Sequence, residues 1–316
     1  MRTNKFLVMS MLVTALLCSC SNEEEPAIAG QGEAMQVSAG IGEATRAVID
    51  AGYGSDLAVS FARLDNPESN TDWTTPAIDA TRLGGGGNTS VTFATAQTYM
   101  AANGQSTLIG YYPQAALSGK NNPTVSYTIT GDEDIMATEV QTGAANAKFT
   151  PFTFQHLLTQ LQFKCSGSAE AVKKWTKVSS ITVKNVYNTL SLSLDKTSGA
   201  TLATTGSANT SLSVIGCPEE VSGPDVTDPK TGYLMIYPVA DMGTESAAIN
   251  LEVKATYNGA EKTLQVPITN ISGGAQKGQS HLITLNFTID GEITIEAGIA
   301  EWQPGNGGSS TITPGA

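Results

Sequence analysis

The sequence predicts an all-β protein made of two tandem β-sandwich domains. Three observations support this prediction. Apolar residues alternate with small or polar ones in many short segments, turn-forming clusters separate those segments, and long helical periodicity is scarce. A chain of 316 residues is long enough for two domains, and its abundant Gly, Thr and Ser with only 15% charged residues suit short strands joined by turns.

Several segments along the chain keep a period of two. Because successive side chains of a strand point to opposite faces, this alternation predicts strands with one buried and one solvated face. The segments are, in order, Met35–Ile41, Leu57–Phe61, Val125–Ile129, Leu190–Leu194, Ile249–Val253, Leu264–Ile268, Ile283–Ile289 and Ile293–Ile295. The dipeptides Asn258-Gly259 and Asp290-Gly291 predict tight hairpin turns between the strands that flank them.

A longer apolar run, Phe152–Phe163, lies in the middle of the chain. Phe154, Leu161 and Phe163 have the character of core residues. We place a domain boundary near Leu157, which predicts one sandwich over residues 47–156 and a second over residues 157–316. Between the predicted strands, Glu170–Lys177 fits a single helical turn.

Residues 1–19 have the features of a signal peptide. Arg2 and Lys5 give a positively charged start, and Phe6–Leu17 is an apolar run that is too short to span a bilayer. These features predict export from the cytoplasm, not a transmembrane helix.

The segment Leu17-Cys18-Ser19-Cys20 resembles the processing site of a bacterial lipoprotein. We expect lipidation at Cys20, which follows a small residue, and not at Cys18, which follows the bulky Leu17. The alternative is an ordinary secretory signal with an incidental cysteine. The acidic run Ser21–Glu25 resembles the export tag of surface lipoproteins in some Gram-negative anaerobes, which predicts an outer-membrane location. Residues 20–46 are interpreted as a lipidated acidic tether together with a removable N-terminal strand.

The charge and the cysteines exclude some functions and leave one choice open. A net charge of −12 without basic clusters disfavours nucleic-acid binding, because that binding needs Lys and Arg on one face. Beyond the signal and Cys20, only Cys165 and Cys217 remain. They form either one disulfide or two buried thiols. Without a C-x-x-C motif, they predict no metal site.

No motif predicts catalysis or a cofactor. His156 and His281 are the only histidines, which makes a Ser-His-Asp arrangement or a secreted hydrolase a minor alternative. Gly84–Gly87 lacks the Gly-Lys-Ser/Thr that would follow in a phosphate-binding loop, and Asp132–Asp134 is interpreted as an exposed acidic corner and not a calcium site. We expect a protein that is not an enzyme and that holds no metal or cofactor.

The three tryptophans raise a different alternative, a glycan-binding surface lipoprotein. Exposed aromatic rings stack on sugars, and Trp73, Trp175 and Trp302 could supply such a platform. The chain has few aromatic residues, so packing in the core or at an edge is the better interpretation of each tryptophan.

Arg46 lies in a stretch of small residues, Glu43–Val48, directly after the first alternating strand. An exposed Arg46-Ala47 bond is a good target for a trypsin-like protease. Cleavage there would separate the strand with apolar Met35, Val37, Ala39 and Ile41 from the rest of its domain.

Taken in order, these segments resemble the fimbrillin family, the subunits of type V pili of gut and oral anaerobes. The resemblance extends over nearly the whole chain. No single motif is highly specific, and the resemblance depends on their order. The matching features are the lipoprotein site with its acidic tail, Thr45-Arg46-Ala47, Asp134-Ile135-Met136, Phe154–Leu161, and Ile299-Ala300-Glu301-Trp302 with the Gly-rich tail that follows.

The resemblance implies a fold of two transthyretin-like Greek-key sandwiches and a mechanism of assembly. An arginine-specific extracellular protease would remove the N-terminal strand, and a C-terminal strand of another subunit, from within residues 292–312, would fill the groove. Donor candidates are Ile293, Ile295, Ala297 and Ile299, or a short segment around Ile312. The alternative for the first is that it is the domain's own last strand, which would suit a tip or anchor subunit. The Gly-rich tail makes the second a weak strand. Expected partners are other pilus subunits and a surface receptor.

Overall fold

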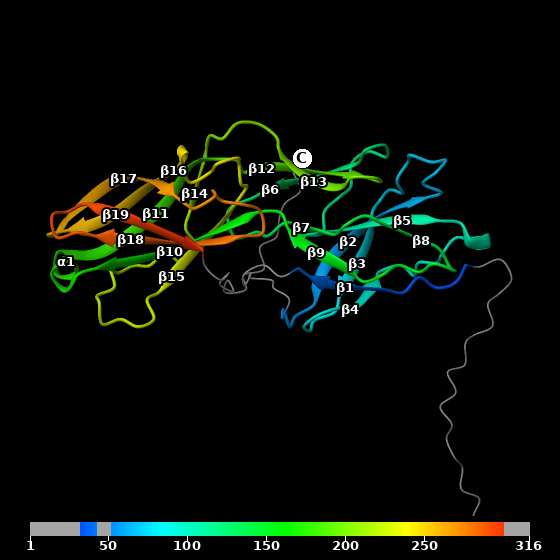
Figure 1. Cartoon of the computed structure of the whole chain (residues 1–316), viewed down its shortest axis with the longest axis horizontal. Helices are drawn as coiled ribbons and strands as arrows, with labels where there is room; N and C mark the ends of the chain where they lie inside the picture. Colours follow the sequence, from blue (N-terminus) through cyan, green and yellow to red (C-terminus); the bar gives the residue numbers. More distant parts are fainter. Residues whose placement is uncertain (1–31, 43–51, 300–316) are drawn as a thin grey trace, which may run out of the picture.

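The computed structural model describes residues 32–42 and 52–299, and the molecule is an elongated array of β-sheets (Figure 1). Cys20, Arg46, Ala47, Trp302 and Ile312, on which several sequence predictions depend, lie outside the described residues. Within them, no helix combines the length and apolar character needed to cross a membrane. The strands confirm the prediction of an all-β chain.

One end of the molecule is an eight-stranded sheet that closes on itself. Its outer strand β2 pairs not only with β3 but also with β5, so seven strands form a ring and β8 extends it. The order is β2 (Leu57–Asp65), β3 (Ile78–Arg82), β4 (Thr89–Phe93), β1 (Val37–Ile41), β9 (Phe152–His156), β7 (Met136–Ala137), β5 (Ser106–Tyr112) and β8 (Gln141–Gly143), with a short 3-10 turn, η1 (Ala101–Asn103), before β5.

A three-stranded sheet covers one outer face of this ring. It consists of β6 (Thr124–Thr128), β12 (Thr189–Asp195) and β13 (Gly199–Thr204). Strand β2 is therefore buried on both faces, with Val59 and Phe61 in the core inside the ring and Leu64 in the core under the second sheet. Alternation alone had predicted one buried face for this segment.

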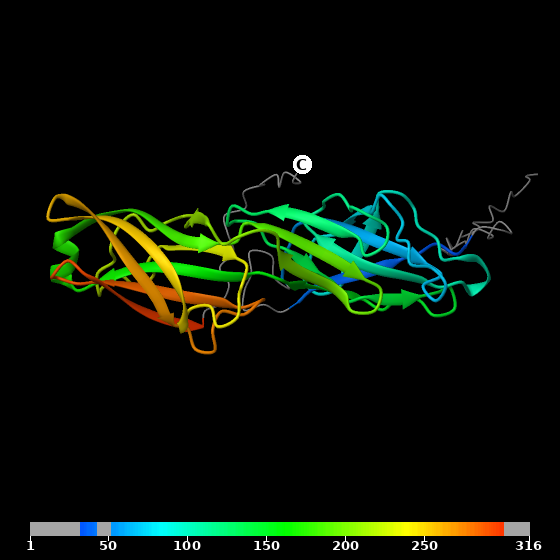
Figure 2. The same ribbon diagram turned by 90° about the horizontal axis from the view of Figure 1, so that it is seen from above.

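The other end holds two four-stranded sheets that face each other. One consists of β15 (Thr231–Ile236), β10 (Thr159–Gly167), β18 (Ser280–Phe287) and β19 (Ile293–Ile299). The other consists of β14 (Thr210–Ser213), β11 (Trp175–Val186), β16 (Thr244–Tyr257) and β17 (Ala260–Asn270). Leu161 and Phe163 of one sheet share a core with Val183 and Leu251 of the other. Figure 2 shows these sheets from above.

The chain passes between the two ends at Leu157 and Leu158, which separate β9 from β10. A boundary was expected there, but strand pairing crosses it in one place. The β12–β13 hairpin, predicted to belong with residues 157–316, pairs with β6 of residues 47–156. The reason is the row Leu190, Leu192 and Leu194, which is fully buried under the ring.

The structure contains the hairpin turn and the helical turn that were predicted from residues close together in the sequence. Asn258 and Gly259 have φ angles of 49° and 79° and connect Tyr257 directly to its partner Ala260, as expected for a hairpin turn. The predicted helical turn is α1 (Ala169–Lys174), which begins where the Ser168 hydroxyl accepts a hydrogen bond from the Ala171 amide at 3.2 Å. Phe154, Leu161 and Phe163 are fully buried, as predicted.

Cys165 and Cys217 are free thiols in this structure. Cys165 is buried on β10 and Cys217 is half-buried in the loop after β14. Burial raises the pKa of both thiols and keeps them protonated near neutral pH. Of the two alternatives, the structure holds the pair of thiols.

Candidate functional site at strand β1

Strand β1 fills a gap in the closed ring. It pairs antiparallel with β4 over Val37–Ala39 and parallel with β9 over Ala39–Ile41 (Figure 1). Its apolar row is buried as the alternation predicts, because the exposed fractions of Met35, Val37, Ala39 and Ile41 are 5%, 7%, 0% and 5%. Without β1, the ring would be open between β4 and β9 and the core inside it would be uncovered.

Backbone hydrogen bonds extend the pairing at both ends of the strand. The Met35 amide donates to the Gln97 carbonyl and the Gly42 amide donates to the Phe154 carbonyl, each at 2.8 Å. Odd-numbered residues of β1 therefore bond toward β4, and even-numbered residues bond toward β9. These hydrogen bonds involve main-chain groups only, so they do not depend on which side chains the strand carries.

Arg82, at the end of β3, ties β1 to a neighbouring loop. Its guanidinium donates from Nε to the Ala39 carbonyl at 3.1 Å and from Nη2 to the carbonyls of Gly85 and Gly87 at 2.8 and 2.9 Å. Nη1 donates to the Leu83 carbonyl at 3.2 Å. The side chain is fully buried, and burial lowers the pKa of the guanidinium. These four backbone dipoles therefore stabilise a buried charge, and one of them belongs to β1.

Gly40 and Gly42 place small residues where β1 passes close to its neighbours. A Cβ added to Gly40 would lie 2.6 Å from Oδ1 of Asn88, and one added to Gly42 would lie 2.5 Å from Oε1 of Gln155. A side chain at either position would have to displace these amides. The groove around β1 therefore favours a strand with small residues at these two positions.

Strand β19, the predicted donor, has the opposite character. It lies at the edge of its sheet, and within the described part of the chain its one strand partner is β18, across His281–Phe287. Ile293, Ile295 and Ala297 are half-buried against the core, and Ile299 is 72% exposed. β19 holds apolar residues that its present position buries only in part.

The other sequence-predicted candidates are structural in this fold. His156 Nδ1 lies 2.6 Å from Asp134 Oδ2, and both side chains are buried. The carboxylate of Glu133 accepts hydrogen bonds from the amides of Thr130 and Gly131, which closes a local turn. Asp134 and Glu133 are thus buried, whereas an exposed acidic corner had been expected.

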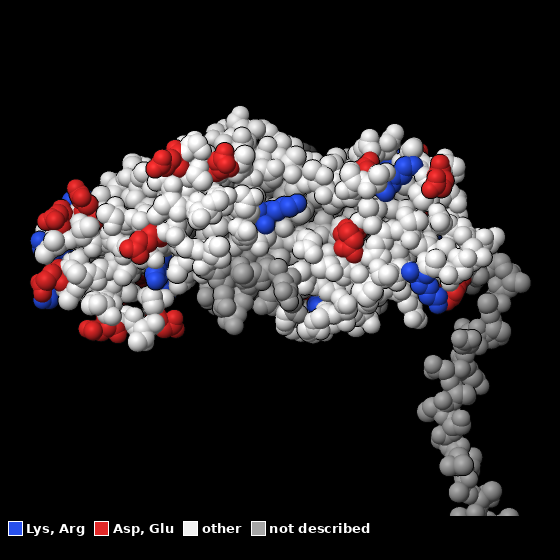
Figure 3. Space-filling model, viewed as in Figure 1, with Lys and Arg blue, Asp and Glu red and all other residues white. Residues whose placement is uncertain are grey.

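The tryptophans described by the structure do not form a sugar-stacking platform. Trp73 and Trp175 are 3% and 1% exposed, and the indole of Trp175 donates to the Thr288 carbonyl at 2.8 Å. They pack in the core, as the preferred interpretation predicted. Charged side chains are scattered over the face seen in Figure 3, where Lys and Arg do not gather into a patch.

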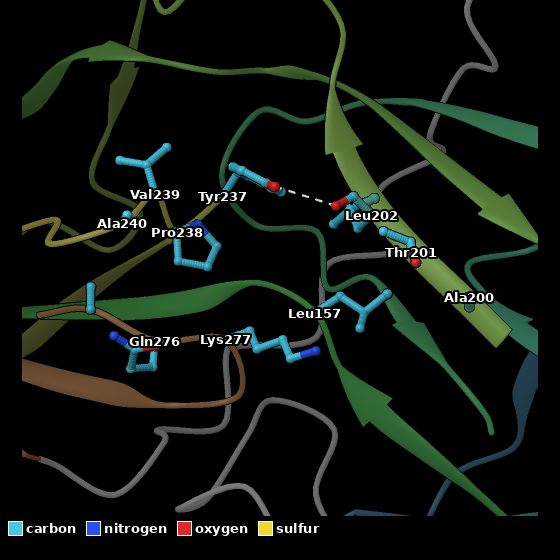
Figure 4. A pocket seen from close by; sticks show the side chains of 11 residues that line it. Leu157, Ala200, Thr201, Leu202, Tyr237, Pro238, Val239, Ala240, Gln276 and Lys277 are labelled. Carbon is cyan, nitrogen blue, oxygen red and sulfur yellow. Dashed lines mark hydrogen bonds between the residues drawn. The ribbon is translucent and has the colours of Figure 1, made fainter. Parts of the chain in front are cut away.

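A cavity of about 350 Å³ opens where the hairpin β12–β13 meets the segment after β15 (Figure 4). Leu157, Leu202 and Val239 line it, and the Tyr237 hydroxyl donates across it to the Leu202 carbonyl at 3.3 Å. Lys277 is the one charged residue among those that line it. The lining also includes the polar Thr201 and Gln276, and it provides no pair of groups suited to acid–base chemistry.

Sequence reasoning found β1 but missed Arg82 and the close fit at Gly40. A signal for Arg82 was present, because Ile78, Ala80 and Arg82 share one face of a strand and Ala80 is buried. The identity of its acceptors was not readable, since Ala39 and Gly87 reach Arg82 only through strand pairing.

A closed β-ring completed by the short strand β1 forms one end of the molecule, and two facing four-stranded sheets form the other. The sequence matches the fimbrillin-like family over residues 45–302, so the chain belongs to that family. As a member, it is a pilus-related adhesion subunit at the cell surface. A search of curated proteins finds no match.

Solved structures support the fold. A candidate cell adhesion protein from Bacteroides uniformis shares 14% identity and a TM-score of 0.61, with 87% of this chain and 98% of that chain covered. A candidate cell adhesion protein from Bacteroides ovatus shares 18% identity and a TM-score of 0.58, with 86% and 98% covered. At these identities, the likeness is one of fold.

Proposed function

We propose that this chain is exported as a lipoprotein through Cys20, is cleaved after Arg46, and then joins a pilus by strand exchange. The observation that carries the proposal is the position of β1. It is a short strand in the centre of a closed sheet. Arg46 lies only five positions beyond Ile41, the last residue of β1. The family match begins at residue 45 and leaves β1 outside the shared part of the sequence.

Removal of β1 would create a strong binding site. Two strand edges, on β4 and β9, would lose their hydrogen-bond partners, and the apolar side chains around Val37 and Ile41 would face water. Each buried aliphatic side chain contributes about 1.5–3 kcal/mol. A strand from another subunit would restore both the ladders and the burial. The segment from Ile293 to Ile312 is the proposed source of that strand.

Limited proteolysis tests this function. Trypsin added to the lipid-free mature chain is expected to cut after Arg46, and the cut chain is expected to form a ladder of polymers on gels run without heating. The control is Arg46→Ala, which should stay uncut at this position and monomeric. Cleavage at Arg46 without polymers would favour a tip or anchor subunit over a stalk subunit, and polymers formed by the Arg46→Ala chain would refute the plug role of β1.

The lipid anchor has its own test. Cells grown with labelled palmitate should label the native chain and should not label Cys20→Ala, while Cys18→Ala should label normally. Labelling of the Cys20→Ala chain would contradict the assignment of Cys20. The lipidated precursor would remain at the outer membrane until cleavage after Arg46 releases it.

A further inference from the structure

Strands β1 and β19 share a three-residue sequence and a similar apolar pattern before it. Residues 35–42 read Met-Gln-Val-Ser-Ala-Gly-Ile-Gly, and residues 293–300 read Ile-Thr-Ile-Glu-Ala-Gly-Ile-Ala. Ala-Gly-Ile is identical in both, and the apolar positions before it agree in parity. The segments come from opposite ends of the molecule (Figure 1) and lie in different sheets.

At β1 the surroundings fit this pattern. Ala39 is fully buried, a Cβ on Gly40 would meet Asn88, and Ile41 is 5% exposed in the core inside the ring. Each residue of the Ala-Gly-Ile triplet therefore has a physical reason to be there.

At β19 the surroundings do not require it. A Cβ added to Gly298 would find no atom within 4 Å, and the glycine has no positive φ angle to explain it. Ile299 is 72% exposed. A glycine inside a strand costs stability, and no close neighbour of Gly298 in its present position explains why a glycine is there.

We propose that β19 of a second copy of this chain takes the place of β1, with Ala297 at the position of Ala39, Gly298 at that of Gly40 and Ile299 at that of Ile41. This inference rests on the proposed function and names its donor strand and its register. Ile293 and Ile295 then occupy the buried positions of Met35 and Val37, and Glu296 takes the outward position of Ser38.

Two features select the register, and a third is compatible with it. A slip of one residue would turn the apolar row of β19 to the solvent. A slip of two residues would bring Glu296 or Ala300 to the close approach at Asn88, and only glycine fits there without displacing it. Arg82 then receives the carbonyl of Ala297 in place of that of Ala39, so its buried charge keeps its full set of acceptors.

The donor can leave its own sheet at a limited cost. β19 pairs with one strand, and β18 stays paired with β10 from Ser280 to Phe287 after β19 departs. The strand exchanges an edge position for a central one, where both of its own edges are hydrogen-bonded. One mismatch remains, because Ala300 corresponds to Gly42 and its methyl group requires the flexible amide of Gln155 to move.

A disulfide trap tests the register directly. In the native groove Ser38 lies opposite Ser90 of β4, and since even-numbered residues of β1 bond toward β9, this is a non-hydrogen-bonded pair, the kind with the closest side chains. In the proposed register Glu296 replaces Ser38. Chains carrying Ser90→Cys are cut with trypsin, mixed with cut chains carrying Glu296→Cys, and oxidised with oxidised glutathione. Both sets carry Cys20→Ala and Cys217→Ser.

The expected product is a covalent link between positions 90 and 296, identified by mass spectrometry of the joined peptides. Chains with Thr92→Cys in place of Ser90→Cys serve as the register control and should link at least tenfold less. A dominant link from 92 to 296, or a link from position 90 to Thr311→Cys in the tail, would overturn the inference while leaving strand exchange intact. Cut chains that neither polymerise nor link would overturn the proposed function together with it.

A peptide of residues 292–300 measures the selection at Gly298. It should bind the cut chain after β1 has been removed, and Gly298→Val should weaken binding more than twofold, because its side chain has to displace the exposed amide of Asn88. Thr294→Val places the same valine side chain at the position of the exposed Gln36, where it meets no close neighbour strand residue, and should change affinity less than twofold. Equal affinities for the three peptides would refute the role of Gly298.

Discussion

Strands β1 and β10 hold equivalent positions in the two ends of the molecule, but they differ in how firmly they are held. Each lies between one antiparallel and one parallel partner. β10 pairs over Thr159–Lys164 with β15 and over Gln160–Gly167 with β18, whereas β1 pairs over only Val37–Ala39 with β4 and Ala39–Ile41 with β9. The comparison shows that a central strand with short ladders, such as β1, has fewer backbone contacts to hold it in its sheet than β10 has.

The core side chains also indicate that β10 is held more firmly than β1. β10 contributes Leu161, Phe163 and Cys165 to its core, while β1 contributes Val37, Ala39 and Ile41, which include no aromatic side chain. β1 gains its remaining support from a single buried cation, Arg82. We therefore expect β10 to unfold only with the whole domain and β1 to open by itself.

The largest expected effect is a truncation in β10. Phe163→Ala leaves a cavity in a fully buried site and should lower the free energy of unfolding by about 3–5 kcal/mol, measured by urea denaturation. The matched change in β1, Val37→Ala, should cost about 1–2 kcal/mol. Equal costs at both sites would remove the difference between the strands.

Arg82→Met should destabilise the ring by about 2–4 kcal/mol, because it leaves the carbonyls of Ala39, Gly85 and Gly87 without this donor in a buried site. Arg82→Lys keeps the charge but cannot reach all the acceptors, so its urea midpoint should fall between those of the native chain and Arg82→Met. If Arg82→Met leaves the free energy of unfolding unchanged, β1 is held by its backbone hydrogen bonds to β4 and β9 and not by Arg82.

Amide hydrogen exchange compares the two strands without substitutions. The amides of Met35 and Gly42, bonded to Gln97 and Phe154, should exchange at least tenfold faster than the amide of Gln160, which is bonded to Gln279. Both rates are measured in the same native chain, so a difference in global stability cannot account for the difference in exchange rate. Slower exchange at β1 than at β10 would argue against independent opening.

The smallest effect concerns pH. Burial lowers the pKa of His281, which lies beside Leu161 in the register of β18 with β10. The unfolded chain therefore binds a proton first as the pH falls below the ordinary value of 6.5, and stability decreases in that range. His281→Gln should flatten the decrease measured by urea titrations between pH 7 and 5. An unchanged slope would assign the pH dependence to other groups.

Local turns and strand faces could be predicted from the sequence, but the strands and side chains that they contact could not. The hairpin at Asn258-Gly259 and the buried row of β1 follow from residues that are neighbours in sequence. The β12–β13 hairpin was assigned to the wrong neighbours, because the alternation of Leu190, Leu192 and Leu194 shows that one face is buried without showing what buries it. For the same reason, Arg82 was not recognised as part of the site.

The sequence by itself determined that the chain is all-β, where most of its strands run, and that two distant segments carry the same Ala-Gly-Ile pattern. These properties depend on the period of two and on turn residues, which act over a few positions. Only the tertiary structure decided that β1 closes a ring, that Gly40 meets Asn88, and that Gly298 meets nothing. Those facts depend on which strands become neighbours, and that is settled by long-range packing of faces that alternation leaves equivalent.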